Sequence, residues 1–312
     1  MSTPFQKSVL VFGATGKQGS AAIDALLAGA NKDNLPLNIL AVTRDRTSRG
    51  SQALAQKSNV SIIEGDLANV ESIFDQATAD GRPVWGVFGV QVNSPDEEKQ
   101  GKSLVTVSAA RGVQHFVYAS GDRGGPERSE ADPTFVKNFA AKFSIEKHLQ
   151  KLAATSRQDM TYTILRPVTF FENMTDDIHG KGFARMWEQM GSRKPLQLIS
   201  TIDIGFFAAQ AFLHPDEHRN MAITLVGDEL TQPQAEVIFK ELVGSSMPMV
   251  PCTVGSAVKF FKKDTVGDMF RWFENNGYGG DVVACRKIYP EMMDYRTWLE
   301  NCSPFIQSRA SR

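Results

Sequence analysis

Cysteine is scarce in this chain of 312 residues, which contains only Cys252, Cys285 and Cys302. Disulfide-dependent secreted domains use paired and closely spaced cysteines, so we expect these three to be reduced thiols. Long apolar runs are missing too, because no stretch approaches the roughly 20 residues that a membrane-spanning helix needs. The first strand-like segment begins near the N-terminus and leaves no room for a secretory leader. These features predict a cytoplasmic protein without a membrane partner.

An excess of charge of either sign is also absent. Lys and Arg number 34 and Asp and Glu number 35, which gives a net charge of −1. Proteins that bind nucleic acid directly usually carry a basic patch that neutralises phosphates, so this balance argues against direct DNA or RNA binding. His214 and His218 stand four residues apart, but Pro215 interrupts the helix face that a zinc site would need. We therefore expect no metal centre.

A glycine-rich segment follows the first apolar run of the chain. Residues 8–12 are mostly apolar, and Gly13, Gly16 and Gly19 come next, before an alanine- and leucine-rich helical pattern over 20–28. In a dinucleotide-binding unit, such glycines permit a tight turn, close approach of the backbone to a pyrophosphate, and close packing of helix on strand. The start of the helix also offers unpaired N–H groups and a positive dipole end to phosphates.

Strand-like and helix-like patterns alternate through the first half of the chain, which is typical of parallel βαβ units. The expected strands cover 37–43, 60–63, 84–90, 115–119 and 161–165, and the expected helices 68–77, 96–111 and 135–154. Residues 121–132 are polar and rich in glycine, so we expect a mobile loop that proteases cut first. The pattern predicts an α/β fold of the Rossmann type, with a doubly wound parallel sheet.

The alternation is lost after residue 167. A helix over 203–213 and a strand over 222–225 return to the pattern, whereas helices over 230–243 and 258–275 lie outside it. The prediction is therefore a dinucleotide-binding domain and a smaller, mostly C-terminal α+β lobe. The first comprises residues 1–168 with a return segment at about 200–226, and the second comprises 169–199 and 227–312. Ligands of doubly wound sheets bind at the carboxyl ends of the strands, so we expect the lobe to roof that edge and contact the substrate.

Arg44 follows the second expected strand directly, where an acidic residue would hold the adenosine ribose of NAD. A guanidinium instead offers a permanently charged, bidentate partner for a 2′-phosphate, and Lys17 in the glycine segment supplies a second cation. These cations favour NADP(H) over NAD(H). The alternative is a solvated surface arginine, and the adjacent Asp45 is an unfavourable neighbour for a bound phosphate.

The glycine segment and several other blocks resemble the NmrA-like family, a branch of the atypical, extended short-chain dehydrogenase/reductases. The resemblance covers nearly the whole chain, and its blocks are residues 13–19, 66–67, 166–174, 203–205, 272–278 and 288–291. Members of this family are of at least two types. Some are reductases on small carbonyl, enone, imine or quinone substrates, and others bind the dinucleotide without evident turnover and act as redox-sensing regulators of transcription.

The resemblance implies a set of cofactor contacts. Asp66 matches the family aspartate that accepts a hydrogen bond from the adenine amine, and its alternative role is to cap the next helix. Gln91 and Asn93 would lie near the pyrophosphate or the nicotinamide ribose, and the segment 167–168 near the carboxamide. The expected cofactor-binding set is Gly13, Thr15, Gly16, Lys17, Gln18, Gly19, Arg44, Asp66, Leu67, Gln91, Lys142, Pro167, Val168 and Phe170.

Tyrosine is missing where typical short-chain reductases have their catalytic acid, four residues before a lysine. Asn138 stands there, four residues before Lys142, and an amide cannot donate a proton with a useful pKa. Lys142 can still bind the nicotinamide ribose or act as the acid itself, and the alternative is a surface lysine paired with Glu146. Ser120, at the end of the fifth strand, is the second catalytic candidate. Its hydroxyl could bind a substrate carbonyl or simply end the strand.

An apolar stripe follows the sixth strand. Phe183, Met186, Trp187 and Met190 recur at helical spacing after Phe170 and Phe171. Such a stripe is usually the core of a domain, and the sharper interpretation is an apolar substrate pocket. The pocket candidates are Phe170, Phe171 and Trp187.

These observations predict an NADPH-dependent oxidoreductase that transfers a hydride to a small, largely apolar carbonyl, enone, imine or quinone. The competing hypothesis is a non-catalytic NADP(H) sensor that regulates transcription negatively through protein partners, in the cytoplasm or the nucleus. Asn138 favours the sensor, whereas the apolar stripe and the complete cofactor motif favour the enzyme. The sequence makes no prediction of oligomeric state.

Overall fold

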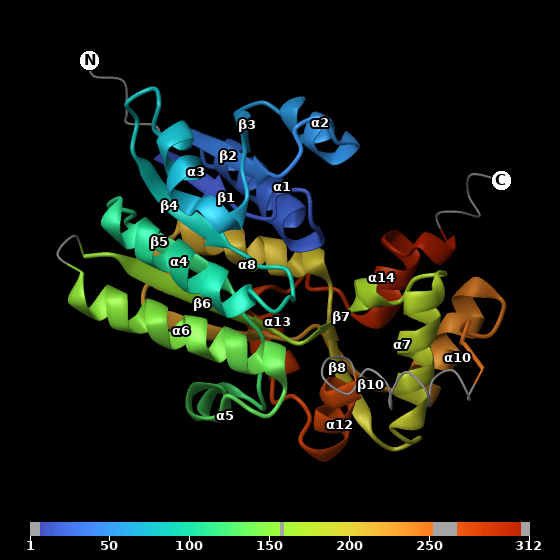
Figure 1. The fold of residues 1–312 in the computed structure, drawn as a ribbon. Helices are drawn as coiled ribbons and strands as arrows, with labels where there is room; N and C mark the ends of the chain where they lie inside the picture. The colour runs from blue at the N-terminus through green and yellow to red at the C-terminus, as the bar shows by residue number, and fades with distance from the viewer. Residues whose placement is uncertain (1–6, 157–158, 252–266, 307–312) are drawn as a thin grey trace. The chain divides into compact units, whose positions relative to one another are not determined.

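The computed structural model describes residues 7–156, 159–251 and 267–306 (Figure 1). Cys252 and the larger part of the helix expected over 258–275 lie outside the described residues. The chain forms two compact units, which are described in turn. The first comprises residues 1–120, 141–166 and 204–223, and the second comprises 121–140, 167–203 and 224–312.

A seven-stranded sheet forms the centre of the first unit, in the order β3-β2-β1-β4-β5-β6-β9. Strand β1 pairs in parallel with both β2 and β4, and the β2–β3, β4–β5 and β5–β6 pairs are parallel too. The order reverses between β1 and β4, which is the switch point where open α/β sheets bind their ligands. The strands are β1 (Lys7–Val11), β2 (Leu37–Thr43), β3 (Val60–Glu64), β4 (Val84–Gly89), β5 (His115–Ala119), β6 (Thr161–Pro167) and β9 (Met221–Leu225).

Helices cover both faces of this sheet, so its central strands are apolar at nearly every position. Every residue of β2 is buried. Helices α3 (Val70–Ala77), α4 (Glu97–Ala110) and α6 (Lys137–Thr155) share one core with alternate strand residues. Helices α1 (Lys17–Lys32) and α8 (Thr201–Leu213) pack together at Gly205, where a Cβ would lie 2.5 Å from the carbonyl of Ala21. Two shorter helices are α2 (Arg49–Ala55) and α9 (Pro215–His218).

The second unit contains a three-stranded sheet in the order β10-β8-β7 and several helices. Strand β7 (Thr169–Phe170) is parallel to β8 (Pro195–Ile199), which is antiparallel to β10 (Asp228–Thr231). Its core is rich in aromatic side chains: Trp298 stacks on Phe171 and Tyr295 at centroid distances of 5.5 and 6.2 Å. The helices are α5 (Pro126–Ala131), α7 (Ile178–Gln189), α10 (Gln232–Val243), α12 (Asp268–Asn275), α13 (Val282–Ile288) and α14 (Tyr295–Asn301).

Residues 121–132 are not the mobile loop that their composition predicts. Asp122 is fully buried, and its carboxylate accepts hydrogen bonds of 2.9–3.2 Å from Gly124, Gly125, Ser129, Thr224 and Gly279. Gly124 and Gly125 have φ angles of +102° and +92°, so these glycines serve a left-handed turn rather than flexibility. The expectation is wrong because composition does not reveal a buried carboxylate that organises the backbone around it.

Asp203, in the first turn of α8, is another fully buried carboxyl of the second unit. Its Oδ2 accepts the N–H of Met293 at 3.1 Å, and its Oδ1 has no hydrogen-bond partner among the described residues. Burial raises the pKa of Asp203 to about 7, against the smaller lowering by the Met293 N–H. The charge of Glu172 raises this pKa further and that of Arg286 lowers it. Asp203 is therefore partly protonated near neutral pH.

We predict that Asp203 makes the free energy of unfolding fall as pH rises from about 4 through about 7. In that range the folded state holds a proton that the unfolded state has released, and the raised pKa corresponds to a contribution on the order of 4 kcal/mol. Asp203→Asn imitates the protonated carboxyl, so its stability relative to wild type should increase between about pH 5 and pH 8 in urea titrations. Asp216→Asn, at an exposed carboxylate, is the control. The difference between its free energy of unfolding and that of wild type should stay constant between about pH 5 and pH 8. The same constant difference for Asp203→Asn would contradict the prediction.

Candidate nucleotide-binding site

The turn after β1 is shaped by its three glycines. Gly13 has φ +60°, a conformation that favours glycine, and its carbonyl accepts the N–H of Gly16 at 2.9 Å. Gly19 packs so tightly on this turn that a Cβ there would lie 2.2 Å from the Gly13 oxygen. Gly16 is exposed and is followed by Lys17, the first residue of α1. The N-terminus of α1 is thus fixed against the end of β1.

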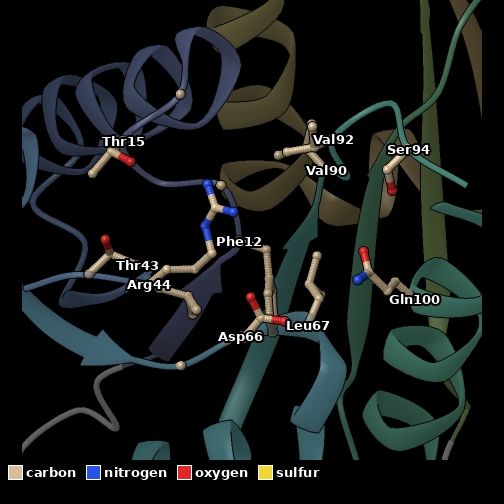
Figure 2. Close-up of a pocket in the computed structure, with 14 residues that line it drawn as sticks. Phe12, Thr15, Thr43, Arg44, Asp66, Leu67, Val90, Val92, Ser94 and Gln100 are labelled. Carbon is tan, nitrogen blue, oxygen red and sulfur yellow. The ribbon is translucent and has the colours of Figure 1, made fainter. Parts of the chain in front are cut away.

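A pocket of about 330 Å³ opens at the carboxyl ends of the first four strands (Figure 2). Its walls come from the segments that follow β1, β2, β3 and β4, together with α4. Because parallel strands end at one edge of the sheet, residues far apart in sequence meet there, at the switch point between β1 and β4. The lining residues are Phe12, Gly13, Thr15, Gly16, Val42, Thr43, Arg44, Gly65, Asp66, Leu67, Val90, Val92, Ser94 and Gln100.

Arg44 lines this pocket from the end of β2, and Figure 2 shows its guanidinium pointing toward the glycine turn. The adjacent Asp45 does not pair with it. The Asp45 carboxylate accepts the side-chain and backbone groups of Thr47 at 2.6 and 2.8 Å, and these bonds lower its pKa. No carboxylate of the described residues forms an ion pair with Arg44. Its positive charge is therefore available to an anion in the pocket.

Asp66 lies in the same pocket with Leu67. Its Oδ1 accepts the N–H of Ala68 at 2.8 Å, which caps the short 3-10 helix η1 (Leu67–Asn69). The capping role that the sequence left open is thus present. A carboxylate has several acceptor positions, so this bond leaves others for a ligand.

Other expected cofactor residues of the first unit do not line the pocket, namely Lys17, Gln18, Gly19, Gln91 and Lys142. Lys17 is exposed at the start of α1, and Gly19 is buried against the turn. Gln91, after β4, is buried, and neither end of its amide has a hydrogen-bond partner among the described residues. Buried polar groups are normally hydrogen-bonded, so this amide is suited to a polar ligand.

Lys142 is not the surface lysine paired with Glu146 that the sequence left as the alternative. Its Nζ lies 2.5 Å from Oε1 of Glu97, in a pair whose side chains are 15% and 1% exposed. Glu146 instead accepts Nη2 of Arg166 at 2.6 Å and the hydroxyl of Ser120, all three being buried. Both catalytic candidates of the first unit are therefore bonded to buried carboxylates. Helical spacing could not predict these two pairs, because Glu146 lies 26 residues from Ser120 and Glu97 lies 45 residues from Lys142.

The remaining candidates belong to the second unit. Pro167 ends β6, Val168 is buried, and Phe170 in β7 is partly exposed. Phe171 and Trp187 are fully buried, so in this structure they cannot touch a substrate. Their rings contact aromatic neighbours of the core, such as Tyr295 and Phe183 at centroid distances of 5.8 and 6.2 Å. These two residues have the packing role that was the alternative for the apolar stripe.

The described residues lack both a metal-binding cluster and a membrane-spanning helix. They contain no group of three His, Cys, Asp or Glu side chains placed to hold a metal ion. The Nδ1 of His218 lies 3.0 Å from the His214 carbonyl, within the short turn that contains α9. No described helix combines the length and the apolar composition that crossing a membrane requires.

Comparison with known proteins identifies the family. The model of the NmrA-like family matches residues 5–301. This chain belongs to the NmrA-like family. It is 28% identical over 177 residues to the NmrA-like family domain-containing oxidoreductase FrzB of Cladobotryum sp., a match covering 53% of this chain and 47% of the relative. It is 24% identical over 198 residues to festuclavine dehydrogenase easG of Aspergillus fumigatus, a match covering 62% of each. The matches to FrzB and to other curated oxidoreductases of the family thus span about half the length of those relatives.

Solved structures of the same fold include proteins with bound dinucleotide. The triphenylmethane reductase of Citrobacter sp. complexed with NADP(H) has a TM-score of 0.68 at 17% identity, with 93% of this chain and 98% of that chain covered. NmrA, a negative transcriptional regulator, in complex with NADP has a TM-score of 0.68 at 18% identity, with 98% of each covered. At these identities the likeness shows the fold alone. The family and the Rossmann-type fold predicted from the sequence are confirmed.

We predict different outcomes for two alanine substitutions in the glycine turn. In Gly19→Ala the new Cβ would lie 2.2 Å from a backbone oxygen, so helix or turn must shift, at roughly 3 kcal/mol. In Gly16→Ala the nearest atom is 3.2 Å away and φ is −82°, so only the poorer helix cap that alanine makes counts, and a loss of about 1 kcal/mol is expected. Urea denaturation of both variants measures the difference. Equal losses would contradict the packing role of Gly19.

Proposed function

We propose that this protein binds NADP(H) in the pocket at the ends of β1 to β4 and acts as an NADPH-dependent oxidoreductase. Its substrate class would be a small, largely apolar carbonyl, enone, imine or quinone. The observation that carries the cofactor proposal is Arg44, which enters the pocket beside the glycine turn without a carboxylate partner among the described residues. A cation without a carboxylate partner, next to the N-terminus of a helix, is suited to a phosphorylated ligand.

The residues of the first unit fit the parts of NADP(H). The N–H groups at the turn and at the start of α1 would hold the pyrophosphate, and Gly16 keeps that wall free of a side chain. Arg44 would pair with the 2′-phosphate and Asp66 would accept the adenine amine. When bound, the cofactor supplies the hydride. The orphaned amide of Gln91 supports a polar ligand on the β4 side of the site.

Lys142 and Ser120 keep the roles proposed for them in the reaction. The Lys142 ammonium is held by a buried carboxylate, which favours binding of the nicotinamide ribose over proton donation. The Ser120 hydroxyl, which donates its one hydrogen to Glu146 in this structure, would turn away from that carboxylate to donate to the substrate oxygen. With Asn138 in place of the usual tyrosine, Ser120 or ordered water delivers the proton in this proposal.

The second candidate function is an NADP(H) sensor that regulates transcription through protein partners. Asn138 favours it, because the usual acid is missing, and so does the pairing of both catalytic candidates with carboxylates. The family names of the curated relatives favour the enzyme, since they are oxidoreductases.

The first test is dinucleotide selectivity. By calorimetry the wild-type protein should bind NADPH at 1:1 and more tightly than NADH. Arg44→Ala removes one charge-assisted bond, so we expect NADPH binding to weaken roughly 10- to 100-fold and NADH binding to change little. Arg46→Ala is the matched control, because Arg46 pairs with Glu64 and does not line the pocket. Equal wild-type affinity for NADPH and NADH would contradict the assignment.

The second test separates the enzyme from the sensor. NADPH absorbance is followed with a panel of quinones, enones, imines and aldehydes, at saturating NADPH. The enzyme proposal expects turnover of at least one class, and loss of that turnover in Lys142→Ala while NADPH still binds. Absence of turnover across the panel, with very different affinities for NADP⁺ and NADPH, would refute the enzyme and support the sensor.

A further inference from the structure

Asp45 places a negative charge directly after Arg44, beside the point where the proposed 2′-phosphate binds. Arg46, on the other side of Asp45, pairs with Glu64 at 3.0 Å instead. Within the described part of the chain, no cation forms an ion pair with Asp45. A carboxylate at the end of the second strand holds the ribose hydroxyl of NAD in other sheets of this type, and it repels a phosphate. The direction of this carboxylate therefore decides how well Arg44 serves NADP(H).

Thr47 holds the Asp45 carboxylate in a local turn. Its hydroxyl and its N–H both donate to Oδ1 of Asp45, at 2.6 and 2.8 Å. Acidic side chains commonly bond the backbone two residues on in this way. The hydroxyl bond is the largest influence on the pKa of Asp45 and lowers it, so Thr47 stabilises the ionised carboxylate. Asp45 does not line the pocket, whereas Thr43 and Arg44 do.

Two other hydroxyl groups fix the backbone of Asp45 independently of its carboxylate. Ser51 is fully buried, and its Oγ donates to the Asp45 carbonyl at 2.7 Å and lies 2.9 Å from the Thr43 hydroxyl. The Thr43 oxygen accepts the N–H of Asp45 at 3.3 Å. The peptide groups on both sides of Asp45 are thus held, and only Thr47 holds its carboxylate among the described side chains. Loss of the Thr47 hydroxyl should release the carboxylate and leave the backbone in place.

We propose that Thr47 determines dinucleotide specificity, because its hydroxyl keeps the Asp45 carboxylate away from Arg44 and so leaves the guanidinium to a 2′-phosphate. A released carboxylate would pair with Arg44 or oppose the phosphate, and it would accept the ribose hydroxyl of NADH. Thr47 acts through Asp45 rather than on the ligand, so it is a positioning residue. This inference rests on the proposed binding of NADP(H), and it holds for the enzyme and the sensor alike.

The test measures NADPH and NADH binding to Thr47→Val by calorimetry. Valine keeps the branched shape and lacks the hydroxyl. We expect NADPH to bind roughly 5-fold more weakly, because a free carboxylate competes for Arg44, and NADH to bind at least as tightly as it binds wild type. Thr47→Ala also lacks the hydroxyl and should give the same result, which covers a failure of Thr47→Val to fold.

Two controls keep or remove a hydroxyl without releasing Asp45. Thr47→Ser retains the bond to the carboxylate, so both dinucleotides should bind it within about twofold of wild type. Thr155→Val is the matched control, because Thr155 is also exposed and its hydroxyl donates to the Lys151 carbonyl at 3.0 Å, at the end of α6. Its affinities for both dinucleotides should equal those of wild type.

A double variant separates the charge of Asp45 from a merely structural role of Thr47. Asp45→Asn alone should change NADPH affinity by less than about twofold, since the carboxylate is already held away. Asp45→Asn combined with Thr47→Val should restore NADPH binding to within about twofold of wild type, because no charge remains to be released. A disordered loop would not be repaired by that second substitution.

Two results would overturn the inference and leave the proposed function intact. The first is a wild-type preference for NADPH that Thr47→Val and Thr47→Ala do not reduce. The second is a reduced preference that Asp45→Asn does not restore, which would mean that Thr47 only supports the loop. A wild-type protein that binds NADPH no more tightly than NADH would refute the proposed NADP(H) site itself, and this inference with it.

Discussion

The close approach of α1 to the turn after β1 is the constraint on which the site depends. A Cβ at position 19 would lie 2.2 Å from the Gly13 oxygen, so only glycine permits this contact. The contact holds the N-terminus of α1 over the switch point of the sheet. Arg44 and Asp66 reach the same pocket because their strands are parallel to β1 and end at the same edge.

Buried carboxylates determine how the cations and donors around them are arranged. Glu97 holds Lys142, Glu146 holds Arg166 and Ser120, and Asp122 collects three backbone N–H groups and two hydroxyls. The last is a structural centre of the second unit, because its acceptors are filled. Glu97 differs, since one of its oxygens has no partner among the described residues.

Much of the fold could be predicted from sequence, because strands buried on both faces are continuous apolar runs and glycine spacing marks the first turn. Arg44 and Asp66 could be placed because each directly follows a strand. The order of residues 121–132 could not be predicted, since Gly279 and Thr224 complete the Asp122 site from more than 100 residues away. The Lys142–Glu97 pair was missed because its partners are also far apart in sequence, at 45 residues. The burial of Trp187 could not be predicted because helical periodicity alone does not distinguish a core from a pocket.

Hydrogen–deuterium exchange with and without NADPH tests the central claim most directly, because it reports where on the backbone the dinucleotide acts. We predict slower exchange on NADPH addition in the segments that follow β1, β2, β3 and β4, namely residues 13–19, 44–48, 65–69 and 90–97. Protection confined to other parts of the chain, or none at saturating NADPH, would contradict the placement of the nucleotide site at this edge of the sheet.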